Sequence, residues 1–99
     1  MKITTNRENE KLTLVVSGRV DTISAPELEK AIMENTDGVT ELVLDLADMP
    51  YTSSAGLRVL LKAQKLMNAK GSMKLIHVGE DVMEILDMTG FAEIMDIES

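Results

Sequence analysis

The chain has 99 residues, of which 44% are hydrophobic, and this predicts one domain with a single packed core over residues 1–99. It contains no cysteine and one histidine, which argues against a thiolate or histidine-rich metal site and fits a reducing, cytoplasmic compartment. Seventeen acidic residues against ten basic ones give a formal net charge of -7, and no apolar run approaches the ~20 residues of a membrane span, so neither nucleic acid nor a membrane is an expected partner.

Predicted strands and helices alternate along the chain. The strand segments are short runs rich in Leu, Val and Ile, and the helical segments carry apolar residues at helical spacing between capping residues. The predicted strands are residues 3–7, 11–17, 41–46, 73–78 and 94–97, and the predicted helices begin at Ser24, at Ser53 or Ser54 and at Gly79 and end at Asp37-Gly38, Lys70-Gly71 and Met88-Thr89-Gly90.

Two of these segments support more specific expectations. Residues 24–27 have the Ser-x-x-Glu form of a capping box, in which the Ser24 hydroxyl accepts from a first-turn amide and Glu27 reaches back to the Ser24 amide. The segment 41–46 has apolar residues at Leu42, Val43, Leu44 and Leu46, which predicts a central strand that is covered on both faces.

The order of the predicted elements indicates the fold class. Strands joined through helices pair in parallel, whereas the first two strands are joined by a short polar turn at residues 8–10 and pair as an antiparallel hairpin. The sequence therefore predicts a small α/β domain, with a mixed but mostly parallel sheet, an antiparallel edge strand and helices packed on the sheet. The order of the strands across the sheet does not follow from these residues.

The most informative stretch is Pro50-Tyr51-Thr52-Ser53-Ser54-Ala55-Gly56-Leu57, where a loop after a strand leads into a helix. Helix N-termini present unpaired amides and a positive dipole, so a serine there either caps the helix or accepts a phosphoryl group that the amides stabilise. Both interpretations stay open for Ser53 and Ser54. Because Ala55 and Gly56 are small, we expect the active site of a partner to approach the Ser54 hydroxyl closely.

A second feature is a basic stripe on the same helix, formed by Arg58, Lys62 and Lys65 at i, i+4 and i+7. In so acidic a chain, this stripe either docks an acidic surface of a partner protein or is an ordinary solvated helix face. Asp21 and Thr22 lie in a polar loop that we expect close to Ser54, provided that the two preceding parallel strands are neighbours.

An enzymatic function is not expected. An activated serine needs a base, and His77, the one histidine, lies at a strand end where a structural role is more common. The chain has no G-x-S-x-G elbow and no phosphate-binding P-loop, and no cofactor is predicted. Asp21 and Asp45 are weak candidates for metal ligands, and a role in ordering its loop is the simpler interpretation of Asp21.

The sequence resembles the bacterial anti-sigma factor antagonists of the stand-alone STAS-domain family over nearly its whole length. The segments that carry the resemblance are Ser17-Gly18-Arg19-Val20-Asp21, Leu42-Val43-Leu44-Asp45-Leu46 with Asp48-Met49, Tyr51-Thr52-Ser53-Ser54-Ala55-Gly56-Leu57-Arg58-Val59-Leu60, and Leu86-Asp87-Met88-Thr89-Gly90-Phe91. The serine motif together with the late Asp-Met-Thr-Gly segment is specific, although either one alone would be weak.

The resemblance implies a binding protein that is switched by phosphorylation. Its unphosphorylated form binds an anti-sigma factor that is also a serine kinase, which frees a sigma factor, and a PP2C-type phosphatase reverses the modification. Alignment of the family pattern D-S-[ST]-G on Gly56 assigns the modified serine to Ser54. The chain departs from this pattern at Ser53, which replaces the aspartate, and at Ala55, which replaces the second hydroxyl residue, so Ser53 is a competing site.

We therefore expect a monomeric anti-sigma factor antagonist whose partner-binding residues are drawn from three segments: Asp21 and Thr22, then Ser53, Ser54, Ala55 and Gly56, then Arg58, Lys62 and Lys65. One alternative is a phospho-switchable or constitutive docking module in another bacterial signalling pathway, such as a two-component, stressosome-like or transporter-associated assembly. Another is a small nucleotide-binding or hydrolytic domain that uses Asp21 and Asp45.

Overall fold

The computed structural model describes residues 1–98 and confirms the predicted order of strands and helices. A short 3-10 helix, η1, precedes the last strand and was not predicted. The elements are β1 (Lys2–Glu8), β2 (Lys11–Ser17), α1 (Ala25–Asn35), β3 (Glu41–Asp48), α2 (Ser54–Lys70), β4 (Ser72–Ile76), α3 (Glu80–Thr89), η1 (Phe91–Glu93) and β5 (Asp96–Ile97).

Several element boundaries differ from the prediction. Strand β5 begins at Asp96 rather than at Ile94, because η1 and the turn after it occupy the chain up to Met95. Two other differences have local reasons in the backbone. Strand β4 ends at Ile76 rather than at Val78, because His77 adopts a left-handed backbone conformation with φ = 55°, which does not continue a strand. Helix α1 ends at Asn35, and Gly38, with φ = 75°, lies in the turn that leads into β3 rather than at the helix terminus.

The sheet has the order β1-β2-β3-β4-β5, so neighbouring strands are also consecutive in the chain. Only β1 and β2 pair antiparallel, and the other three pairs are parallel. This confirms the predicted α/β class with an antiparallel edge strand. It also supplies the strand order that the sequence could not, and makes β2 and β3 parallel neighbours.

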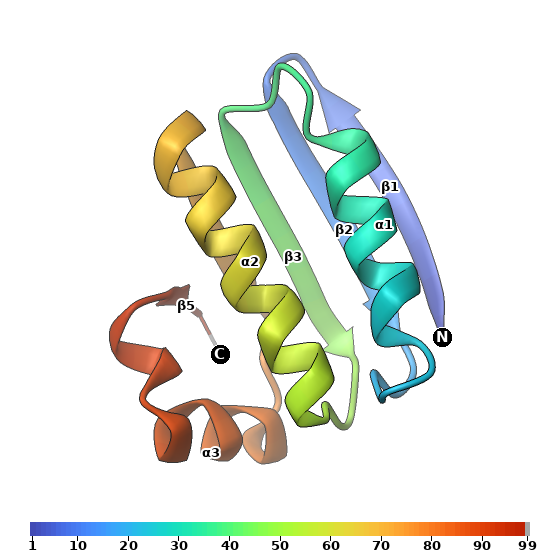
Figure 1. Cartoon of the computed structure of the whole chain (residues 1–99), viewed down its shortest axis with the longest axis vertical. Helices are drawn as coiled ribbons and strands as arrows, with labels where there is room; N and C mark the ends of the chain where they lie inside the picture. The colour runs from blue at the N-terminus through green and yellow to red at the C-terminus, as the bar shows by residue number, and fades with distance from the viewer. Residues whose placement is uncertain (99) are drawn as a thin grey trace.

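Helices α1 and α2 lie side by side on one face of the sheet, and α3 lies at the end where β3 terminates (Figure 1). Because side chains alternate between the faces of a strand, every second residue of β2 and β3 is buried beneath these helices. The buried side chains include Leu12, Leu14 and Val16 of β2 and Leu42, Leu44 and Leu46 of β3.

The expectation that β3 is covered on both faces is wrong. Its other face presents Val43, Asp45 and Ala47; Val43 is buried, but Asp45 is half-buried and Ala47 is exposed. Thr13 and Lys74 lie beside Val43 on the neighbouring strands. The sequence prediction rested on Val43, the one buried residue of that face. The helices cover only the opposite face of β3.

Candidate functional site

The loops that follow β2 and β3 run side by side. Beyond the strand ends, the Gly18 amide donates to the Asp48 carbonyl at 2.8 Å and the Val20 amide donates to the Tyr51 carbonyl at 3.1 Å. The Ser53 amide then donates to the Val20 carbonyl at 2.8 Å, immediately before α2 begins. The parallel pairing of β2 and β3 therefore continues into the loops and brings Asp21 next to the start of α2, as expected for neighbouring strands.

The two serines at the start of α2 have different environments. Ser53 is the N-cap residue, with φ = -88° and ψ = 176°, and its hydroxyl accepts from the Gly56 amide at 3.4 Å. Ser54 is the first helical residue, and its side chain is exposed. The capping role thus belongs to Ser53, whereas Ser54 presents a hydroxyl to solvent beside the helix terminus.

Gly56 packs inside the fold in the first turn of α2, and its role in the approach of a partner stays a prediction. It is buried, and a Cβ atom placed on it would lie 2.2 Å from the Thr52 hydroxyl oxygen and 2.8 Å from Cγ1 of Val20. The missing side chain lets the first turn of α2 pack directly on the paired loops. Ala55, by contrast, is half-buried and lies next to Ser54 at the surface.

Asp21 organises its own loop, and the predicted capping box is absent. Its Oδ1 accepts from the Ile23 amide at 3.0 Å and the Ser24 amide at 2.9 Å, so the Ser24 amide is already bound. The Ser24 hydroxyl accepts from the Asp21 amide at 2.9 Å instead of capping α1. Hydrogen bonds from Ser24 to the charged carboxylate hold the pKa of Asp21 below its usual value.

This lowered pKa leads to a pH-dependent prediction. Stability from a carboxylate with a depressed pKa is fully present above the unfolded pKa of about 3.9 and is lost as the pH falls through the lower folded pKa. We expect Asp21→Asn, which keeps an oxygen acceptor without the charge, to lower the Tm relative to the unsubstituted chain at about pH 6 and to lower it less at about pH 2.5. Thermal unfolding followed by circular dichroism measures this, and an equal Tm difference at both pH values would contradict it.

The same loops expose side chains that the sequence did not single out. Ile23 is 90% exposed next to Asp21 and Thr22, and Tyr51 is 40% exposed. The guanidinium of Arg19 lies 4.8 Å from the centre of the Tyr51 ring. An isoleucine isolated in a polar loop was the available signal for Ile23, whereas the contact between Arg19 and Tyr51 depends on the pairing of the two loops.

The basic stripe of Arg58, Lys62 and Lys65 is exposed on α2. Lys62 is not free, because its Nζ lies 3.0 Å from Glu29 Oε1 on α1. Next to this ion pair, an open groove of about 300 Å³ separates the two helices. Its lining includes Thr22, Pro26, Glu29, Ala55, Arg58 and Lys62. The groove connects the stripe with the loops around Ser54.

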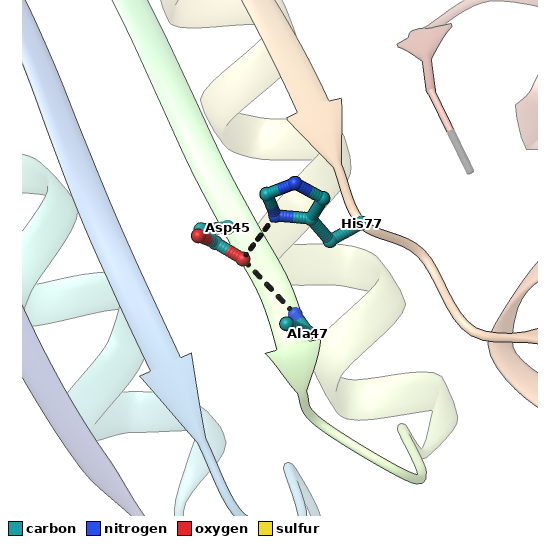
Figure 2. Close-up of polar contacts among 3 residues, drawn as sticks. All are labelled: Asp45, Ala47 and His77. Atoms are coloured by element: carbon teal, nitrogen blue, oxygen red, sulfur yellow. Dashed lines mark hydrogen bonds and ion pairs between the residues drawn. The ribbon is translucent and has the colours of Figure 1, made fainter.

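Asp45 and Asp21 belong to separate clusters. Figure 2 shows Asp45 on β3 pointing toward His77, and Asp45 Oδ1 lies 3.0 Å from His77 Nδ1 and accepts from the Ala47 amide at 3.1 Å. The bonds of the Asp21 carboxylate stay within its own loop. Within residues 1–98, no group of three or more His, Cys, Asp or Glu side chains is arranged to hold a metal ion.

None of the helices within residues 1–98 is both long and apolar enough to cross a membrane.

Residues 2–99 match the model of the STAS domain family. Bordetella bronchiseptica BtrV, whose name assigns it provisionally to the anti-sigma factor antagonists, is 34% identical, and the match covers 98% of this chain and 85% of BtrV. The anti-sigma-B factor antagonist of Bacillus subtilis is 30% identical, with coverage of 94% of this chain and 87% of that protein.

The fold also matches a solved structure of the Bacillus cell fate determinant SpoIIAA in its phosphorylated form. The TM-score is 0.76 and the identity is 14%, with coverage of 99% of this chain and 92% of that chain. At this identity the match shows a shared fold. It agrees with the order of strands and helices described above.

Proposed function

Because this chain belongs to the STAS domain family, we propose that it is an anti-sigma factor antagonist whose binding to an anti-sigma factor is switched by phosphorylation of Ser54. Two relatives over nearly the whole chain carry the name of anti-sigma factor antagonists, and SpoIIAA, which shares the fold, occurs in a phosphorylated form. The observation that carries the proposal for this chain is the exposure of Ser54 while the neighbouring Ser53 caps the helix.

The docking face of the unphosphorylated protein would consist of the two paired loops and the exposed side of α2. Ile23 offers an apolar anchor, Tyr51 with Arg19 offers an aromatic and cationic contact, and the basic stripe suits an acidic surface. Asp21, Thr22 and Ala55 complete this face beside the two serines. Gly56 contributes from below, because it lets α2 approach the loops.

Phosphorylation would oppose docking through charge and hydration. A phosphate adds about -1.5 to -2 charges and three strong acceptor oxygens, whose burial against a partner requires desolvation. The added charge falls on a chain whose formal net charge is already -7. The amides at the start of α2 stabilise the phosphate on the free protein, so the switch requires no large conformational change.

In this proposal the chain is the substrate of an enzyme rather than an enzyme itself. The anti-sigma factor supplies the serine kinase activity and a PP2C-type phosphatase removes the phosphate. The protein acts as a monomer in the cytoplasm and needs no cofactor. Its single interaction surface then serves two partners in turn.

Mass spectrometry after incubation with the cognate kinase and ATP tests the modification. We expect one phosphate on the unsubstituted chain and on Ser53→Ala, and none on Ser54→Ala. The two alanine variants are matched, since they remove neighbouring hydroxyls of the same helix start, and only Ser53 has a capping bond to lose. A phosphate that stays on Ser54→Ala would assign the site to Ser53 and contradict the proposal.

A second function is supported by Ser53, which stands where the family pattern has an aspartate. The hydroxyl of Ser53 accepts the capping bond from the Gly56 amide, as an aspartate at this position could. Unlike an aspartate, it places no negative charge beside Ser54. A constitutive docking module in another signalling pathway would bind its partner through the basic stripe. No phosphate on any serine, together with binding that does not depend on ATP, would favour this function.

A further inference from the structure

Arg58 lies one helical turn after Ser54, on the same side of α2. Residues four apart on a helix are neighbours on its surface, and helical side chains lean toward the N-terminus. The guanidinium is therefore within reach of a group attached to the Ser54 hydroxyl. Arg58 also lines the groove between α1 and α2. Thr22, from the loop after β2, and Ala55, from the first turn of α2, line the same groove.

The charged neighbours of Arg58 are already paired with each other. Lys62, the next cation along the stripe, is held by Glu29 at 3.0 Å. Lys65 lies almost two helical turns beyond Arg58, and is therefore farther from Ser54. Within residues 1–98, the guanidinium of Arg58 has no hydrogen bond or ion pair in the structure, although its side chain is exposed next to an acidic residue of the groove.

We propose that Arg58 binds the phosphate on Ser54 within the same chain, an inference that rests on the proposed function. Arginine presents a planar fork of donors that matches two phosphate oxygens at once. The order along the helix is also favourable, because an acidic group four residues before a basic one is the better orientation for an ion pair. Ser54 and Arg58 have this order.

Such a contact gives phosphorylation a second effect. In the unphosphorylated protein, Arg58 is an exposed cation of the docking face and is available to an acidic partner. In the phosphorylated protein, the same guanidinium is occupied by the phosphate. One modification thus adds negative charge at Ser54 and withdraws the nearest positive charge from the partner, so the two effects on docking act in the same direction.

The test uses the full chain with Ser54→phosphoserine introduced during synthesis, so that no kinase is needed. Titration of the phosphate by 31P NMR reports how strongly its dianion is stabilised. A cation in contact lowers the pH at which the second proton leaves. We expect Arg58→Gln to raise the midpoint by roughly 0.3 pH units, as for an exposed ion pair one turn apart. Lys65→Gln removes the same charge from the same helix and is expected to leave the midpoint nearly unchanged.

Arg58→Lys keeps the positive charge but loses the planar pair of guanidinium donors. We expect its titration midpoint to lie between those of the unsubstituted chain and of Arg58→Gln. Equal midpoints for the Arg58→Gln and Lys65→Gln variants would show that only the general field of the helix acts, and this would overturn the proposal. The result is independent of the kinase. If the kinase does not modify Ser54 but the midpoints differ as expected, the proposed function fails while the contact between Arg58 and the phosphate stands.

Discussion

Gly56→Ala is expected to lower the free energy of unfolding by about 2–3 kcal/mol, within the range for overpacking a tight interior. The new Cβ would lie 2.2 Å from the Thr52 hydroxyl oxygen and 2.8 Å from Cγ1 of Val20, and both residues are almost fully buried. Neither can move easily, because the backbone bonds of Val20 to Tyr51 and Ser53 hold the two loops together. Helix α2 must therefore shift away from the loops, and Ser54 shifts with it.

Urea unfolding measures this cost, and Gly79→Ala is the matched control. A Cβ on Gly79 meets nothing within 4 Å, and its φ of -72° suits any residue. The loss of glycine at an N-cap and the reduced freedom of the unfolded chain oppose each other there, so we expect a net change within about 1 kcal/mol. Equal destabilisation by the two substitutions would show that Gly56 is not needed for close packing.

The elements of the fold could be predicted because their signals are local. Apolar residues recur at helix or strand spacing within each segment, and Gly90 ends α3 in a left-handed conformation, which glycine adopts without strain. The strand order required information from outside each segment. The error about the second face of β3 has the same origin, since the burial of Val43 depends on what lies on the neighbouring strands.

The start of α1 shows how a correct local pattern can be overridden. Ser24 and Glu27 have the spacing of a capping box, but the Ser24 amide donates its hydrogen bond to the Asp21 carboxylate instead of to Glu27. Asp21 is held in place by the pairing of Val20 with Tyr51 in the next loop, a contact between residues far apart in the chain. Sequence spacing within one segment cannot reveal this competition.

The candidate site was predictable in part. The motif predicted a serine at the start of a helix, and this is confirmed. Asp21 was expected near that serine if β2 and β3 were neighbours, a condition that only the structure supplies. The motif could not decide which serine caps the helix, because the two hydroxyls differ by one position in the chain. The bond from the Ser53 amide to the Val20 carbonyl sets that register, and it depends on the neighbouring strand. The exposure of Ser54 follows from it.

The second large effect concerns affinity. Phosphorylation of Ser54 is expected to weaken binding to the anti-sigma factor by about 100-fold or more, since like-charge contact and desolvation at an interface cost several kcal/mol. Ser54→Asp adds one charge and fewer acceptors, so its effect should be smaller. Ser54→Ala adds no charge to the docking face and should bind nearly as well as the unmodified chain. Part of the loss should be relieved at high salt, which screens the exposed charges.

The most direct measurement is a calorimetric titration of the anti-sigma factor with the unmodified chain and with the chain that carries Ser54→phosphoserine, at one salt concentration. The account predicts tight binding of the unmodified chain and a dissociation constant at least about 100-fold higher for the phosphorylated one. Circular dichroism of both chains beforehand ensures that they are equally folded. Equal dissociation constants for two equally folded chains would contradict the claim that the exposed Ser54 hydroxyl controls docking.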